Sequence, residues 1–198
     1  MFKVIEYNKT SLTIINQTKL PLVEDYETYS DYIDMVDAIK KLKVRGAPLI
    51  GVMVAYGISV CLNNCELKST HELIKYYQKI RDAFYKSRPT AKNLFYAIER
   101  IDDVIYQKNY SDVDEIKQLV EKEAINIHNS EIQSCLSIAQ IAYDKIFKQK
   151  ESYNFITHCN TGSLATGGLG TALGIIKYIH RQGGKVHVFV DETRPLLQ

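Results

Sequence analysis

The sequence has 198 residues, of which 45% are hydrophobic and 24% are charged, and its formal net charge at pH 7 is +2. This composition is that of a globular protein, and the balanced charge favours neither nucleic acid nor a membrane surface as a partner. No stretch reaches the roughly 18 apolar residues of a membrane span, and residues 1–6 lack the features of a signal peptide. We therefore expect a cytoplasmic protein, whose four cysteines are too few for a disulfide framework.

The first 150 residues predict a mostly helical domain that opens with a small β-hairpin. Strand-like runs at residues 2–7 and 12–15, on either side of a polar turn, indicate two antiparallel strands. Apolar residues then recur at helical spacing, and capping residues and prolines mark the helix ends. These signals predict helices at residues 31–43, 49–62, 69–87, 90–105 and 111–148. The second helix is so uniformly apolar that we expect it at the centre of the core.

The last part of the chain predicts a strand, a helix and a second strand. An apolar run at residues 155–158 ends at Cys159 and is followed by turn residues. Helical spacing resumes near Gly170 and stops at Gly183, and residues 186–190 form the second strand. Together these elements predict one parallel β-α-β crossover.

The fold class that follows is α/β. We predict a helical amino-terminal domain with its hairpin at residues 1–150, and the start of a Rossmann-like parallel sheet, incomplete in this chain, at residues 151–198. Ligands of open parallel sheets bind outside the carboxyl ends of the strands, which is where Cys159 lies.

The start of the second predicted helix has the composition of a phosphate site. Arg45 offers a guanidinium, and the small residues Gly46 and Ala47 let an anion approach backbone amides at a helix amino terminus. Arg88 stands in the same place before the fourth helix. The alternative for each arginine is a tight loop in which it pairs with a nearby carboxylate. Two arginines at two helix starts favour an anionic ligand.

Cys159 is the best candidate for a nucleophile or proton donor, because it precedes glycine-rich backbone at a helix start, where the dipole favours a thiolate. The alternative is a buried structural cysteine. His158 is not expected to pair with it, since neighbouring strand residues point to opposite faces. Cys61 and Cys65 lack further metal ligands, so we expect core packing and no metal. The glycines of residues 168–174 match a dinucleotide fingerprint only loosely, so we expect no nucleotide.

Four segments together resemble a known family. They are VRGAPLIGVMVAYG at residues 44–57, SRPTAKNLFYAI at 87–98, THCNTGSLATGGLGTALG at 157–174 and VDETRPLLQ at 190–198. The segments are similar to the signatures of the methylthioribose-1-phosphate isomerase family, enzymes of methionine salvage, and the third is specific. The same fold family includes ribose-1,5-bisphosphate isomerases and the regulatory subunits of eukaryotic initiation factor 2B, which share ETRP but are not similar to NTGSLATGG.

The resemblance implies roles for individual residues. The residues that would contact the sugar phosphate are Arg45, Gly46, Ala47, Arg88 and Gln198. Cys159 would be the catalytic thiol. The family's other catalytic group is an aspartate in a downstream segment, followed by an asparagine–lysine pair, and these 198 residues contain none of the three. We therefore expect a truncated reading frame, a deliberately shortened chain or one half of a split protein.

The activity that the resemblance implies is the isomerisation of 5-methylthioribose 1-phosphate to 5-methylthioribulose 1-phosphate, without metal or cofactor. Two other substrates remain open, 5-deoxyribose 1-phosphate and ribose 1,5-bisphosphate, as does a non-catalytic sugar-phosphate-binding or assembly module. Because the resembling enzymes are homodimers, we expect a homodimer or a complex with a separate carboxyl-terminal half. The last predicted strand supports this expectation, because an uncovered apolar edge favours pairing.

Overall fold

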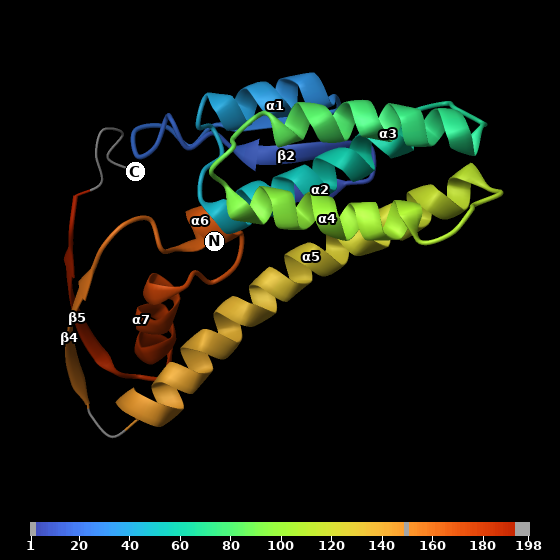
Figure 1. Ribbon diagram of the computed structural model, residues 1–198. Helices are drawn as coiled ribbons and strands as arrows, with labels where there is room; N and C mark the ends of the chain where they lie inside the picture. Colours follow the sequence, from blue (N-terminus) through green and yellow to red (C-terminus); the bar gives the residue numbers. More distant parts are fainter. Residues whose placement is uncertain (1–2, 149–150, 193–198) are drawn as a thin grey trace. The chain divides into compact units, whose positions relative to one another are not determined.

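The computed structural model describes residues 3–148 and 151–192. The chain divides into two compact units, residues 1–128 and residues 129–198, and the division falls inside the long helix α5 (Val113–Ala142) (Figure 1). The sequence predicts a boundary after residue 150, where the helical pattern ends. The observed division lies earlier because the last turns of the helical segment pack within the second unit, where the rings of Tyr143 and Tyr178 meet edge to face.

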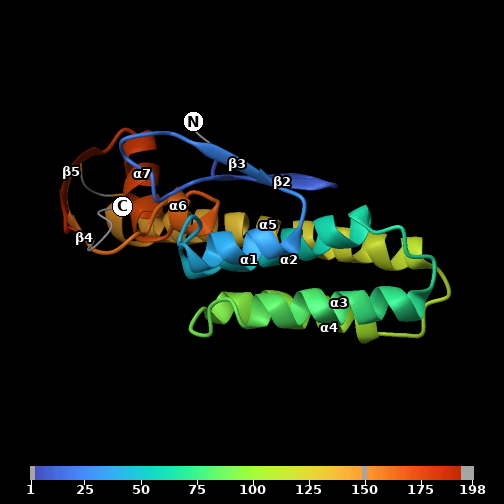
Figure 2. The ribbon, with the colours of Figure 1, turned by 90° about the horizontal axis from the view of Figure 1, so that it is seen from above.

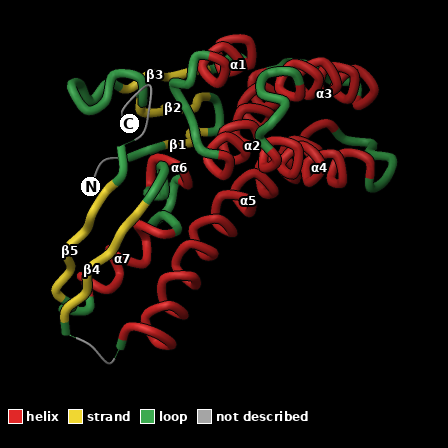
Figure 3. Tube along the Cα trace, turned by 60° about the vertical axis from the view of Figure 1, so that its left-hand side comes forward, coloured by secondary structure: helices red, strands yellow, loops and turns green. Residues whose placement is uncertain are grey.

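A three-stranded antiparallel sheet opens the first unit. Its strands are β1 (Ile5–Asn8), β2 (Ser11–Ile15) and β3 (Tyr26–Tyr29), in the order β1-β2-β3 (Figure 3). The predicted hairpin is confirmed, whereas β3 is a strand that the sequence analysis missed. Its sequence, YETY, has too few apolar residues for the alternation that identifies a half-buried strand.

Four helices complete the part of the first unit that precedes α5: α1 (Tyr32–Lys40), α2 (Ala47–Asn64), α3 (Thr70–Tyr85) and α4 (Lys92–Tyr106). Every residue of α2 from Leu49 to Leu62 is buried, which confirms the prediction that this helix is central. By length and composition α2 could cross a membrane, and 78% of it is buried inside the structure. Burial on all sides explains its uniformly apolar sequence.

The caps of these helices follow the sequence in two cases and depart from it in one. The sequence allows Ser30 or Asp31 as the cap of α1, and the structure uses Asp31, whose side chain accepts a hydrogen bond from the Ile33 amide at 2.7 Å. Ser69, which the sequence predicts as the cap of α3, accepts one from the Glu72 amide at 3.4 Å, so that cap is confirmed. The sequence predicts Thr90 as the cap of the fourth helix, and this prediction is wrong by one residue, because the amino-terminal cap of α4 is Ala91. A turn in which the Ala91 amide donates to the Arg88 carbonyl at 3.1 Å delays the helix.

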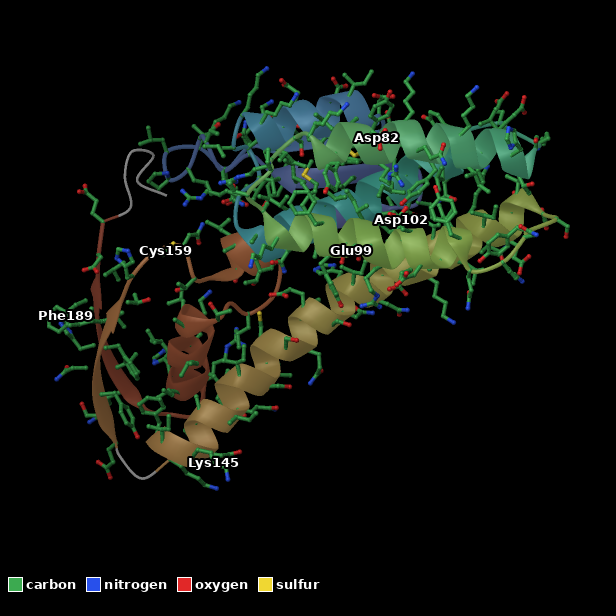
Figure 4. The ribbon with its side chains drawn as sticks, viewed as in Figure 1. Asp82, Glu99, Asp102, Lys145, Cys159 and Phe189 are labelled. Carbon is green, nitrogen blue, oxygen red and sulfur yellow. The ribbon has the colours of Figure 1, made fainter. Side chains whose placement is uncertain are left out.

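The second unit contains the predicted crossover. β4 (Ser152–Thr157) and β5 (Lys185–Val190) are parallel, and the segment between them contains α6 (Ser163–Thr166) and α7 (Ala172–Arg181). A π-helical turn (Tyr143–Phe147) follows α5. Helix α7 packs against both strands, and on β4 Tyr153 and Thr157 are buried. Ile156 is 79% exposed and Phe189 55% exposed, so apolar side chains of both strands face solvent (Figure 4). The description Rossmann-like stays a prediction.

Candidate functional site

The segment that leads into α2 is held firmly in the first unit. The Lys43 carbonyl accepts a hydrogen bond from the Gln17 amide at 2.9 Å, and the Lys43 ammonium contacts Glu27 Oε2 at 2.7 Å. Burial raises the pKa of Glu27, but Lys43 and the other hydrogen-bond donors lower it more, so that the pKa lies below its usual value. Val44 is completely buried. Arg45 therefore follows a fixed stretch of chain and is itself partly buried.

Helix α2 begins without a side-chain cap. Its amino-terminal cap is Gly46, whose φ of 92° lies in the region that favours glycine, and no side chain hydrogen-bonds the cap position. Ala47 is exposed, and the first turn contains Pro48, which has no amide to satisfy. Uncapped first-turn amides and the helix dipole are the features with which a helix amino terminus binds an anion.

Helix α4 begins in a similar way. Its cap residue, Ala91, makes no side-chain hydrogen bond, and Arg88 lies three residues before it in the turn. The Nη1 atom of Arg88 is buried and has no hydrogen-bond partner among the residues that the structure describes. A buried cationic N–H group without a partner is unfavourable by about 1–3 kcal/mol or more. An anionic ligand would satisfy it.

The two helix starts lie close together. A Cβ atom added to Gly51, in the second turn of α2, would be 2.6 Å from the carbonyl oxygen of Asn93, in the first turn of α4. Both helices begin at the same end of the first unit (Figure 2). The structure thus brings the start of α2, which follows Arg45, close to the start of α4, which follows Arg88, so that two helix dipoles act near one place.

Cys159 lies in the second unit, two residues beyond the end of β4 (Figure 4). It is exposed and has a φ of 67°, which is unusual for a residue other than glycine. Its neighbour His158 contacts Asp191 instead, with Nδ1 3.1 Å from Oδ2, and both side chains are exposed. The expectation that His158 does not pair with Cys159 agrees with this contact.

The other cysteines are less accessible. Cys61 and Cys135 are buried and Cys65 is partly buried. The sequence predicts core packing for Cys61 and Cys65, and the burial of Cys61 agrees with that prediction. Burial, reinforced by the charge of Asp31, raises the pKa of Cys61 to about 12, and burial also raises the pKa of Cys135. Within residues 3–148 and 151–192, no cluster of three histidine, cysteine or acidic side chains could hold a metal ion.

The sequence pattern marks Asn160 only as a turn residue. In the structure its Nδ2 atom is buried and lacks a hydrogen-bond partner among the described residues. Its position directly after the candidate thiol was a signal that could have identified it. Gln198, which the resemblance implicates in phosphate binding, lies outside the described residues.

A separate hollow of about 260 Å³ lies between α3 and α4 in the first unit, and Figure 4 labels Asp82, Glu99 and Asp102 from its lining. The residues that line it are Arg81, Asp82, Tyr85, Phe95, Ile98, Glu99 and Asp102. Asp102 already accepts a hydrogen bond from Tyr77 and, like Asp82, contacts Arg81. No residue that the sequence analysis proposed lines this hollow.

Comparisons with known proteins identify the class to which this fold and these residues belong. The profile of the Initiation factor 2 subunit family matches residues 43–198, and the chain belongs to that family. Curated relatives named methylthioribose-1-phosphate isomerase are similar to the chain over its whole length. The relative from Dehalococcoides mccartyi is 42% identical over 196 residues, which cover 99% of this chain and 57% of the relative.

A second relative, methylthioribose-1-phosphate isomerase 2 of Pseudothermotoga lettingae, is 41% identical over 198 residues, covering 100% of this chain and 55% of the relative. The chain thus spans about half the length of the curated relatives it matches. The crystal structure of 5-methylthioribose 1-phosphate isomerase from Pyrococcus horikoshii superposes with a TM-score of 0.92 at 33% identity, over 100% of this chain and 55% of that one.

A solved structure with a different name is also similar. The translation initiation factor eIF-2B, subunit delta, from A. fulgidus has a TM-score of 0.84 and 34% identity, over 100% of this chain and 56% of that chain. One fold therefore occurs in relatives named as an isomerase and as an initiation factor subunit.

Proposed function

We propose that this protein is an aldose–ketose isomerase that converts 5-methylthioribose 1-phosphate into 5-methylthioribulose 1-phosphate in methionine salvage. The observation that supports it most directly is the buried, unpartnered Nη1 of Arg88, at a place where the starts of α2 and α4 approach each other. A phosphate group matches that place in charge and geometry. Relatives that are 42% and 41% identical to the chain are named methylthioribose-1-phosphate isomerases, and the proposed reaction is inferred from those names.

In this proposal Arg88, Arg45 and the backbone of Gly46 and Ala47 hold the phosphate, together with Gln198. The left-handed conformation of Gly46 and the uncapped start of α2 support the role of the backbone. Cys159 supplies the catalytic thiol. Its exposure beyond the carboxyl end of a parallel strand supports that role, because such ends are where ligands bind in open sheets.

The chemistry explains why a thiol and an anion site serve one reaction. A sugar with phosphate on its anomeric oxygen does not open to an aldehyde unaided, so the enzyme must protonate the ring oxygen. Hydrogen must then leave carbon 2 and a hydrogen must arrive at carbon 1. A thiol and a carboxylate on opposite sides of that bond can carry out these transfers while the phosphate is held still. In the resembling family the carboxylate is supplied by a downstream aspartate.

We also propose that the protein is cytoplasmic and works as a homodimer or with a separate carboxyl-terminal half. The exposed side chains of Ile156 and Phe189 support a covering partner, because adjacent apolar side chains on a strand pair are a common contact surface.

A second function has its own supporting observation. The similarity to eIF-2B subunit delta, with a TM-score of 0.84, is compatible with a non-catalytic module that binds a sugar phosphate or assembles with other chains. The substrates 5-deoxyribose 1-phosphate and ribose 1,5-bisphosphate would suit the same phosphate site. These two sugars differ from 5-methylthioribose 1-phosphate only in the substituent at carbon 5.

The deciding experiment supplies the downstream portion of the Dehalococcoides mccartyi relative as a separate chain. We expect the 198-residue chain alone to bind 5-methylthioribose 1-phosphate without turnover, since loss of one acid–base partner costs about 10² to 10⁴ in rate. Turnover should appear with the downstream portion and disappear again in Cys159→Ser. Binding without any turnover would favour the non-catalytic module. Absence of binding would show that the proposal is wrong.

A further inference from the structure

The side chain of Asn160 has no evident structural partner. Its Nδ2 atom is buried, yet the described part of the chain offers it no hydrogen bond. An amide N–H left in this state costs about 1–3 kcal/mol, and a folded protein rarely retains such a group without a reason. The atom belongs to the residue directly after Cys159.

An asparagine after a strand usually stabilises its own turn or caps the next helix. In this loop Thr161 performs those tasks. Its Oγ1 accepts a hydrogen bond from the Leu173 amide in the first turn of α7 at 3.2 Å, and it lies 3.4 Å from Oγ1 of Thr157. Its carbonyl accepts the Thr171 amide at 2.9 Å. Asn160 is therefore not needed to shape the loop.

The loop backbone that follows Asn160 is closely packed. Gly170 has a φ of 102°, and a Cβ atom there would lie 2.6 Å from the Thr161 carbonyl oxygen and 2.7 Å from Gly162 Cα. Two segments of the loop backbone, one at Gly170 and one at residues 161–162, are thus in close contact. Cys159, with its φ of 67°, ends the extended strand geometry just before Asn160. Asn160 thus lies between a residue with an unusual backbone conformation and a closely packed stretch of loop.

We propose that Asn160 is a substrate-contacting residue whose Nδ2 donates a hydrogen bond to the oxygen on carbon 2 of the sugar phosphate. This inference rests on the isomerase function proposed above. The oxygen on carbon 2 is the one that becomes the ketone, so it gains carbonyl character beside the atoms on which Cys159 acts. Asn160 keeps both amide protons and transfers nothing. It orients the sugar and stabilises charge on that oxygen.

A neutral amide fits this role for a physical reason. A fixed donor aimed at an oxygen whose charge grows during reaction needs no reorganisation when the charge appears. The donor also satisfies its own buried N–H only when the sugar is bound, so its hydrogen bond contributes to affinity as well as to rate. A phosphate oxygen is a different acceptor, and the probes below separate the two.

The test observes the side-chain amide of Asn160 directly by ¹H–¹⁵N NMR of the unaltered 198-residue chain. The two probes are inorganic phosphate, which lacks the carbon 2 oxygen, and 5-methylthioribulose 1-phosphate, which has it as a ketone. We expect the Arg88 guanidinium signals to shift with both probes, and the Asn160 amide signals to shift only with the ketose phosphate.

Three outcomes would overturn the inference, and they are distinguishable. If the ketose phosphate shifts the signals of Arg88 but not those of Asn160, the proposed function is unaffected, and Asn160 is not a substrate contact. Equal shifts at Asn160 with both probes would show that Asn160 contacts the phosphate group and not the oxygen on carbon 2. No shift at either residue with either probe would remove the proposed function and the inference with it.

A variant gives an independent readout. Asn160→Ala should weaken binding of 5-methylthioribulose 1-phosphate about 2- to 10-fold, the usual value of one neutral hydrogen bond, and leave the affinity for inorganic phosphate unchanged. The control is Asn154→Ala, an exposed asparagine on β4, which should change neither affinity. Unchanged ketose phosphate binding by a folded Asn160→Ala protein would contradict the proposal.

Discussion

At the scale of single residues, the two proposals rest on two buried nitrogen atoms. They are Nη1 of Arg88 and Nδ2 of Asn160, both without a hydrogen-bond partner in the described chain. The first is positively charged and suits a phosphate, whereas the second is neutral and suits a carbonyl or hydroxyl oxygen. These are the acceptors that the proposals above assign to each atom.

The replacement Arg88→Lys should weaken binding of inorganic phosphate about 10-fold. Lysine keeps the charge but cannot form the planar, two-pronged contact of a guanidinium. Isothermal titration with phosphate at low ionic strength measures the change. Arg181→Lys, at the exposed last turn of α7, is the matched control and should have no effect. Equal affinity in Arg88→Lys and the unaltered chain would place the anion elsewhere.

Cysteine reactivity provides a second residue-level prediction. Cys159 is exposed, whereas Cys61 and Cys135 are buried and their pKa values are raised by burial. Iodoacetamide at pH 8 should therefore modify Cys159 first, the partly buried Cys65 more slowly, and the other two only after unfolding. Timed labelling with mass spectrometry measures the order. Early labelling of Cys61 or Cys135 in the folded protein would count against the assignment.

At the scale of elements, the decisive feature is how closely α2 approaches α4. Gly51 allows this approach because it has no Cβ atom, and the group it faces is backbone, which cannot move aside as a flexible side chain can. The approach is what brings the two uncapped helix starts together. Neither helix start alone would distinguish a phosphate site from an ordinary loop.

Gly51→Ala should destabilise the protein by about 1–3 kcal/mol, the usual cost of forcing a methyl group into a packed contact. It should also weaken phosphate binding, because α4 must move. The control is Gly174→Ala in α7, where the added Cβ would have its nearest neighbours at 3.5 Å and where alanine is the better helix former. Urea unfolding of both variants measures the difference. Equal stability of the two variants would show that the close contact is not limiting.

At the scale of the whole molecule, each unit buries an apolar core, and the second unit also exposes apolar side chains that lie together on its strand pair. The first unit encloses α2 on all sides. In the second unit Ile156, Phe189 and Val190 are 79%, 55% and 70% exposed on the parallel strand pair. Apolar side chains gathered on one strand pair are a surface for association.

Ile156→Lys should reduce concentration-dependent self-association of the 198-residue chain without lowering its melting temperature, because the side chain is not part of the core. Light scattering over a concentration series measures the effect. Ile33→Lys is the control, since Ile33 is 63% exposed on α1 and should not affect association. If the two variants associate alike, the strand pair is not the contact surface.

The sequence by itself determined the helices, the central place of α2 and the β-α-β crossover, because helical and strand periodicity and local capping residues are encoded within a few neighbouring positions. It also identified Arg45, Arg88 and Cys159 as candidates from their places before helices and after a strand. Only the tertiary structure decided that α2 and α4 begin side by side, that β3 joins the hairpin, and that Asn160 has a buried amide without a partner. Contacts between distant segments and the satisfaction of buried hydrogen bonds depend on the packing of the whole unit, which no local pattern records.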